Sequence, residues 1–312
     1  MNLLITRHDK IGDFITILPM LKIIKSQSNH RITVLVSRVN YELAQSIDTI
    51  DDVILYTKET GALVKAIKAR NIDVSISCFI DTHLAWVLFL ARIKTRISPA
   101  TKFAQAFFNN TVRQARSEAI KTEWQYNIDL LALIDLNVSY DFERPLLHFS
   151  KDLAAATKVR TVAFHSGSGG SSDGNLRLDD YLNLARSLSE KDNIRILFTF
   201  GPDDNKNKRY IEQHLDFDAE LINSSNSLLS FCQLLNNVDV FVSTSTGPMH
   251  LAGALNIHTL SFFGSSQFAS PKRWATVNDA SKQSNIQVPD QYSSALYQEI
   301  EAKLADILKN RR

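Results

Sequence analysis

Residues 236–266 read NNVDVFVSTSTGPMHLAGALNIHTLSFFGSS, and this stretch decides the fold. The apolar, mostly β-branched run at 238–242 predicts a buried strand, and small and apolar residues at helical spacing over 248–255 predict a short helix. A second apolar run at 258–263 predicts another strand. Strand, helix and strand in this order form a βαβ unit, with parallel strands and a right-handed crossover.

The turn between the first of these strands and the helix has the residue types that bind anions. Ser245 and Thr246 carry hydroxyl groups, Gly247 lets a ligand approach the backbone, and His250 follows about one turn into the helix. The first N–H groups of a helix have no partner inside it, and the helix dipole adds partial positive charge, so a phosphate can be held there without a metal. The alternative is an ordinary helix start, with Ser245 or Thr246 as the cap and Pro248 in the first turn.

Length and composition favour a soluble protein of two domains. The chain has 312 residues, 44% of them hydrophobic and 22% charged, and its net charge of +2 is too small to indicate nucleic acid as a partner. Cys78 and Cys232 lie far apart in apolar segments, as buried thiols of a reducing compartment do. The first residues do not resemble a signal peptide, and the most apolar run, 84–91, is much shorter than the roughly 20 residues of a membrane span. We therefore expect a cytoplasmic location.

The N-terminal segment places a carboxylate where α/β proteins bind ligands. Residues 2–6 predict a strand, 7–13 (RHDKIGD) a loop and 14–25 a helix, so Asp13 stands at the carboxyl end of a strand. Asp13 is either a general base or simply the helix cap, with Arg7 or Lys10 as a solvated neighbour. Strands near 31–36, 52–56 and 72–78 alternate with helices near 41–46 and 61–70, which indicates a layered α/β domain. The fingerprint G-x-G-x-x-G is absent from the first turn, which disfavours a dinucleotide-dependent oxidoreductase.

The segment from 92 to 121 is basic and contains aromatic residues. Its cations are Arg92, Lys94, Arg96, Lys102, Arg113, Arg116 and Lys121, and Phe103, Phe107 and Phe108 lie among them. Such a face can rest on an anionic membrane surface or bind a phosphorylated lipid head group. A solvated basic surface with the phenylalanines in the core fits equally well. A linker is expected between about residues 141 and 159.

The second half of the chain has a further loop suited to phosphate. A strand at 161–165 is followed by SGSGGSSDGN, which includes Ser166, Gly167 and Ser168, and then by a helix at 178–189. Glycine- and serine-rich loops in this position often hold phosphates, although a flexible surface loop is the alternative. After the next strand, 194–200, Asp204 can accept hydrogen bonds from ribose hydroxyls or cap the following helix.

Three separate segments together resemble glycosyltransferase family nine, the bacterial heptosyltransferases. RHDKIGDFITILP is similar to the opening R-x-x-x-x-G-D-x-x-x-x-x-P of that family, with Arg7, Gly12, Asp13 and Pro19 in register. FHSGSGG at 164–170 resembles the H-P-G-A loop. VFVSTSTGPMHLAGAL resembles V-V-x-x-D-T-G-x-x-H-L-A-A-A-L, and FFG at 262–264 continues the match.

The resemblance implies an α/β protein of GT-B architecture, two Rossmann-like domains facing each other across a cleft. Residues 1–150 would form the acceptor-side domain and 151–312 the nucleotide-sugar domain, with the final helix packing back on the N-terminal domain. It implies an inverting, metal-independent transfer of a sugar, typically from ADP-heptose, to the lipopolysaccharide core, with no cofactor. The partners would be the nucleotide sugar and a lipid-linked phosphorylated saccharide, with the membrane surface as a further one and the inner membrane as a peripheral location.

Each candidate residue then has an expected role. Asp13 is the expected catalytic base. The expected donor site comprises Ser166, Gly167, Ser168, Asp204, Ser245, Thr246, Gly247 and His250. Contacts with the acceptor are expected from Arg7, Lys10, Arg92, Lys94 and Arg96.

The chain also departs from the family pattern. Ser245 stands where the family has an aspartate, and Gly174 stands where it has a lysine, for which Arg177 is a shifted replacement candidate. These differences leave the sugar and the nucleotide open. They also favour a second hypothesis, a sugar-nucleotide-binding or assembly protein without catalysis, which the intact Asp13 disfavours. A nucleotide-sugar epimerase is a lesser rival, because its chemistry needs further acids and histidines.

Overall fold

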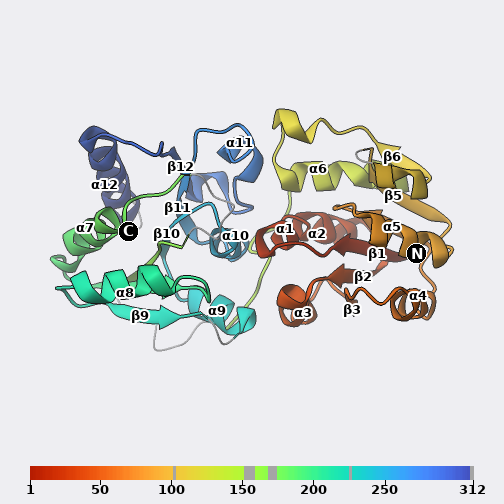
Figure 1. The fold of residues 1–312 in the computed structure, drawn as a ribbon, viewed down its shortest axis with the longest axis horizontal. Helices are drawn as coiled ribbons and strands as arrows, with labels where there is room; N and C mark the ends of the chain where they lie inside the picture. Colours follow the sequence, from red (N-terminus) through yellow and green to blue (C-terminus); the bar gives the residue numbers. More distant parts are fainter. Residues whose placement is uncertain (101–102, 151–158, 168–173, 225–226, 310–312) are drawn as a thin grey trace. The chain divides into compact units, whose positions relative to one another are not determined.

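The computed structural model describes residues 1–312 except 101–102, 151–158, 168–173, 225–226 and 310–312. The chain divides into two compact units, Met1–Leu146 and Leu147–Arg312, which Figure 1 shows in red to yellow and in green to blue. The division falls inside the segment 141–159 where a linker was expected.

The first unit is built on a six-stranded parallel sheet of order β3-β2-β1-β4-β5-β6. Its strands are β1 (Asn2–Arg7), β2 (Arg31–Val36), β3 (Asp52–Leu55), β4 (Val74–Ser77), β5 (Thr95–Pro99) and β6 (Asn110–Val112). Its helices are α1 (Ile11–Ile15), α2 (Leu18–Gln27), α3 (Arg38–Gln45), α4 (Thr60–Lys68), α5 (Thr82–Leu90) and α6 (Glu123–Asp129), with the short 3₁₀ turn η1 (Phe103–Phe107). Leu3, Leu4 and Ile5 of β1 are fully buried, as expected for a central strand that is covered on both faces.

The predicted helix at 14–25 is in fact two helices. α1 already begins at Ile11, so the prediction of a loop up to Asp13 is wrong for its last three residues. α2 starts at Leu18 and has Pro19 in its first turn, where the missing N–H of proline removes no hydrogen bond. Asp13 therefore lies in the middle of the five-residue helix α1, shortly before α2 begins.

The second unit repeats the same strand order. Its sheet runs β12-β11-β10-β7-β8-β9, which read from the other end is again the doubly wound order with the first strand third. The strands are β7 (Arg160–His165), β8 (Ile194–Phe200), β9 (Glu220–Asn223), β10 (Val240–Thr244), β11 (His258–Phe263) and β12 (Gln283–Gln287). The helices are α7 (Leu178–Ser189), α8 (Asn205–His214), α9 (Leu228–Leu235), α10 (Gly247–Ala254), α11 (Pro271–Trp274) and α12 (Ser294–Lys309). The predicted βαβ unit is confirmed, because β10 and β11 are adjacent and parallel and α10 joins them.

The last helix packs within its own unit. Ile300, Leu304, Ile307 and Leu308 of α12 lie at helical spacing and are buried in the core that also contains α7 and the strands of the second sheet. The packing of this helix on the N-terminal domain stays a prediction, and the stripe named here is buried within the second unit.

None of the helices in the described part of the chain has both the length and the apolar character needed to cross a membrane.

Candidate active site

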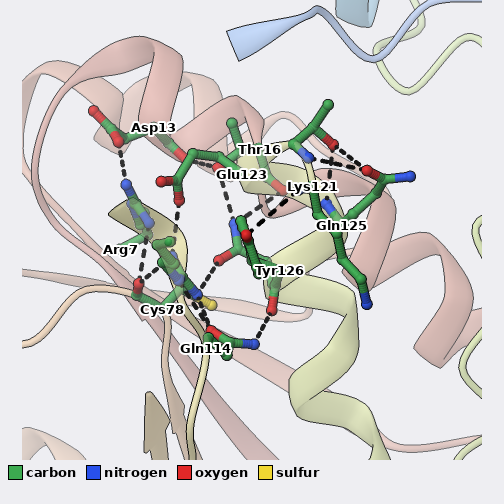
Figure 2. Close-up of polar contacts among 12 residues, drawn as sticks. Arg7, Asp13, Thr16, Cys78, Gln114, Lys121, Glu123, Gln125 and Tyr126 are labelled. Carbon is green, nitrogen blue, oxygen red and sulfur yellow. Dashed lines mark hydrogen bonds and ion pairs between the residues drawn. The ribbon is translucent and has the colours of Figure 1, made fainter. Parts of the chain in front are cut away.

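Asp13 is held by a buried arginine at the carboxyl end of the first sheet. Arg7, the last residue of β1, is only 4% exposed. Its guanidinium donates to the Asp13 carboxylate and to the backbone carbonyl of Cys78 at 3.1 Å (Figure 2). It also donates to Asp9 Oδ1 at 2.9 Å. The Asp13 side chain itself keeps 15% of its surface exposed. A carboxylate oriented in this way can accept a proton from a group that approaches from solvent.

Three acidic side chains surround the buried guanidinium of Arg7 and stabilise its positive charge. Burial by itself lowers the pKa of Arg7, but Asp9, Asp13 and Glu123 outweigh it and raise the pKa above its ordinary value. Burial raises the pKa of Asp9 to about 6, although the neighbouring Arg7 opposes this shift. The guanidinium therefore remains a permanent cation between two carboxylates.

The residues expected to bind the acceptor lie in different places. Arg7 is committed to internal contacts, so the expectation that it meets the acceptor does not fit its burial. Lys10 is exposed and immediately precedes α1, the helix that contains Asp13. Arg92 and Lys94 precede β5 and Arg96 is its second residue, so all three lie at the amino edge of a parallel sheet. Asp13 is at the opposite, carboxyl edge, and the structure does not bring these three cations to it.

Sequence reasoning missed a histidine pair at the same carboxyl edge. His8 Nε2 is hydrogen-bonded to the carboxylate of Asp81, which also accepts from the Leu84 amide at 2.8 Å and so caps α5. Burial alone would raise the pKa of Asp81, but its hydrogen bonds with His8 and Leu84 lower it overall. The ring of His8 lies 4.1 Å from that of Tyr56, whose hydroxyl is 3.0 Å from His83 Nδ1. The only signal in the sequence was the position of each residue just after a strand.

In the second unit, the start of α10 has the form expected of an anion site. Thr246 is the N-cap residue, but its hydroxyl donates back to the carbonyl of Thr244 at 3.3 Å and does not cap the helix amides. Gly247 and Ser245 are half-buried, while His250 is 96% buried in the first turn beside Trp274. The ordinary capping hydrogen bond is thus missing, and the helix dipole faces the carboxyl edge of the sheet uncapped by a side chain.

The loop after β7 meets this turn at the same edge, because β7 and β10 are neighbours in register from Val162 to His165. Ser166 is 99% buried, and its hydroxyl has no hydrogen-bond partner within the described residues. Gly167 lies directly against Asp204, since a Cβ built on it would be 2.4 Å from the Asp204 carboxylate oxygens. Asp204 also accepts from the Gly201 amide at 2.6 Å. Ser168 lies outside the described residues.

A buried histidine accompanies Asp204. His165 Nε2 is 3.7 Å from Asp204 Oδ2, and His165 Nδ1 is 3.1 Å from the hydroxyl of Thr199. Burial lowers the pKa of His165, while the Asp204 carboxylate opposes that shift. His165, which directly precedes Ser166, thus links Asp204 to Thr199 of β8.

Arg177, the candidate replacement for the missing lysine, is paired with an acidic residue in this structure. Its guanidinium donates to Asp180 at 2.9 Å and lies 5.0 Å from the ring centre of Tyr292, and its side chain is 69% exposed. Gly174, at the position of the lysine, packs against the backbone of Phe263 and Gly264. No described group of three or more histidine, cysteine or acidic side chains could hold a metal ion.

Comparison with known proteins agrees with this geometry. The model of glycosyltransferase family 9 (heptosyltransferase) matches residues 60–301. The chain belongs to glycosyltransferase family 9. A Haemophilus influenzae protein named "Putative glycosyltransferase" is 31% identical over 304 residues, covering 90% of this chain and 87% of that relative.

Solved structures of the family share the fold of this family 9 glycosyltransferase. The E. coli ADP-heptose lps heptosyltransferase II has a TM-score of 0.79 at 16% identity, covering 99% of this chain and 98% of that chain. The E. coli heptosyltransferase WaaC with ADP has a TM-score of 0.77 at 16% identity, covering 97% of this chain and 99% of that chain. The expected GT-B architecture of two Rossmann-like domains is therefore confirmed, and the protein is a glycosyltransferase.

Proposed function

We propose that this glycosyltransferase moves a sugar, with ADP-heptose as the expected donor, to the phosphorylated saccharide core of lipopolysaccharide. The observation that carries the proposal is the carboxylate of Asp13, oriented by a buried arginine and still open to solvent. The uncapped start of α10, beside the buried hydroxyl of Ser166, supports a separate role for the second unit as the donor site.

The proposed reaction is a single displacement that inverts the configuration at the anomeric carbon of the transferred sugar. Asp13 takes the proton of an acceptor hydroxyl while the oxygen attacks the anomeric carbon. The bond between that carbon and the diphosphate oxygen breaks, and its electron pair leaves with the diphosphate. The amides at the start of α10, together with the partial positive charge of the helix, stabilise this developing charge in place of a metal ion.

The residues at the carboxyl edge of the second sheet can each be assigned a contact with the donor. We assign the diphosphate to the turn Ser245–Thr246–Gly247, with the imidazole of His250 close by. Ser166 and Gly167 would line the same phosphates, with Ser168 expected to join them, and Asp204 would accept from the ribose hydroxyls. A WaaC structure named with ADP supports adenosine as the nucleoside. Ser245, in place of the family aspartate, would alter the contacts with the sugar.

The donor can be tested by thermal stabilisation. A ligand that binds only the folded protein at about 100 times its Kd adds about 2.7 kcal/mol, which for a unit of this size raises Tm by about 5 °C or more. We expect this shift for ADP-heptose and for ADP, and none for adenosine, which lacks the diphosphate.

The same panel would include UDP- and GDP-sugars, and each nucleotide sugar would be assayed for turnover. A shift with a UDP- or GDP-sugar and none with ADP-heptose would overturn the assigned donor. If the panel gave neither a shift nor turnover, the proposed use of these nucleotide sugars as donors would be wrong.

We also propose that the surface of α5 rests on an anionic lipid membrane, since the acceptor is lipid-linked. Trp86 and Phe89 of α5 are 41% and 46% exposed, and both rings lie within 6 Å of the Phe107 ring. The Arg96 guanidinium lies 5.6 Å from the centre of the Phe89 ring. Arg92 and Lys94 are exposed on the segment that follows α5. Exposed aromatic rings beside cations are typical of protein surfaces that lie on a membrane.

Binding to vesicles tests this surface. Each cation near an anionic membrane contributes about 1 kcal/mol, so Arg92→Gln with Lys94→Gln should weaken binding to phosphatidylglycerol vesicles about tenfold or more. Vesicles of phosphatidylcholine alone should bind both proteins weakly. Val39→Ala, at an exposed apolar residue of α3, is the matched control and should leave binding unchanged. Equal binding by the double variant and the wild type would rule the surface out.

A further inference from the structure

The carboxylate of Asp13 is the partly exposed member of a larger, buried polar network. Arg7 donates to one oxygen of the Asp13 carboxylate and so orients the side chain. The backbone of the same residue is held independently. Thr16, which follows the last residue of α1, donates its hydroxyl to the Asp13 carbonyl at 2.6 Å, and its amide donates to the same carbonyl at 3.2 Å.

The hydroxyl of Thr16 is in turn fixed from α6. Asn127 Nδ2 donates to Thr16 Oγ1 at 2.9 Å and to the Thr16 carbonyl at 3.2 Å. Asn127 is fully buried and Thr16 is 1% exposed, so water does not compete for these hydrogen bonds. Because Asn127 supplies the N–H, the Thr16 oxygen is left to donate its own hydrogen to Asp13.

Arg116 joins the two arms of the network. Its guanidinium donates to Asn127 Oδ1 at 3.3 Å, to Glu123 Oε2 at 2.8 Å and to the Cys78 carbonyl at 3.4 Å. That carbonyl is the one that accepts from Arg7. The contacts therefore form a closed ring from Asp13 through Arg7, the Cys78 carbonyl, Arg116, Asn127 and Thr16 back to Asp13, part of which Figure 2 shows.

We infer that Thr16 and Asn127 are positioning residues for the catalytic base, an inference that rests on the role proposed for Asp13. α1 has only five residues, too short to be rigid by itself. The arm from α6 fixes its end, while Arg7 fixes the carboxylate. A base must lie within hydrogen-bond reach of the proton it takes, so a loose α1 lowers the rate of transfer without altering how the donor binds.

A pair of substitutions at Thr16 separates this role from stability. Thr16→Val keeps the shape of the side chain and removes the hydroxyl, whereas Thr16→Ser keeps the hydroxyl and removes a buried methyl group. Both variants can cost stability, the serine through the cavity it leaves and the valine through the hydrogen bonds it removes, so the rates are compared with Tm for each variant. We expect Thr16→Val to lower kcat about tenfold with the donor KM unchanged, and Thr16→Ser to keep kcat within about twofold of wild type. Asn127→Leu should lower kcat as Thr16→Val does.

The assay uses the nucleotide sugar that the wild-type protein turns over fastest, and Tm is recorded for every variant. In an Asp13→Ala background, Thr16→Val should have no further effect on the residual rate, since there is no base left to position. Full activity of Asp13→Ala would show that the proposed base is wrong. If Asp13→Ala is inactive while Thr16→Val keeps the wild-type kcat, or Thr16→Ser is as slow as Thr16→Val, the positioning role alone is overturned.

Discussion

Asp13→Asn is expected to lower kcat by about 10²–10⁴-fold, the range that general base catalysis contributes. Asparagine has the size of aspartate, so Arg7 keeps an oxygen to donate to, and its charge is still matched by Asp9 at 2.9 Å. The fold should therefore persist. The donor is assigned to the second unit, so the rise in Tm with ADP-heptose should be the same in the variant and in the wild type.

Asp9→Asn is the matched control for this substitution. It removes the other carboxylate on the same guanidinium but leaves Asp13 in place, and we expect a kcat within about tenfold of wild type. Steady-state transfer assays and thermal stabilisation of both variants give the comparison. An Asp13→Asn protein with wild-type kcat would disprove the assignment of the base. Equal losses in the two variants would mean that the charge balance around Arg7, and not the carboxylate of Asp13, limits the rate.

The central parts of both sheets were predictable from the sequence because their strands are buried on both faces. β1 contains the apolar run LLI and β10 the run VFV, and such runs in a chain of alternating strands and helices have few alternatives. Of the four edge strands, only β3 was predicted, and the inner strand β5 was missed as well. β6 reads NTV, β9 reads ELIN and β12 reads QSNIQ, and each is short and partly exposed, so neither period nor composition distinguishes it from a loop.

Only those parts of the candidate site that a short stretch of sequence determines could be predicted. Asp13 lies in the first helix after β1 and the turn at Thr246 directly follows β10, and these positions at the carboxyl ends of strands indicate a ligand site. The support for Asp13 comes from Asn127, 111 residues from Thr16 in the sequence, and no local pattern links such distant side chains. Arg7 was expected to meet the acceptor because its charge is visible in the sequence, whereas its burial is set by the fold.

A second large effect is expected at Gly174, this time on stability. A Cβ at this position would lie 2.2 Å from the amide nitrogen of Gly264 and 2.3 Å from the carbonyl carbon of Phe263. Both are backbone atoms at the end of β11, so the overlap cannot be relieved by rotating a side chain. Inserting a methyl group into packed structure costs typically 1–3 kcal/mol and occasionally more. We expect Gly174→Ala to lower the free energy of unfolding by about 3 kcal/mol, or Tm by roughly 6 °C.

The same substitution should also weaken donor binding. The Gly174 carbonyl accepts from the hydroxyl of Thr244, the last residue of β10, and the proposed diphosphate turn begins one residue later. Moving Gly174 therefore moves the strand end that sets this turn, and the rise in Tm with ADP should be smaller than in the wild type.

Gly61→Ala is the control for Gly174→Ala, because a Cβ at Gly61 has no atom within 4 Å. Gly61 lies in the first turn of α4, where alanine should be neutral or stabilising by up to about 1 kcal/mol. Calorimetry of both variants, with and without ADP, separates a general effect of losing a glycine from the specific overlap. If Gly174→Ala were as stable as Gly61→Ala, Gly174 could not pack against Phe263 and Gly264 as described, and its proposed influence on the diphosphate turn would be wrong.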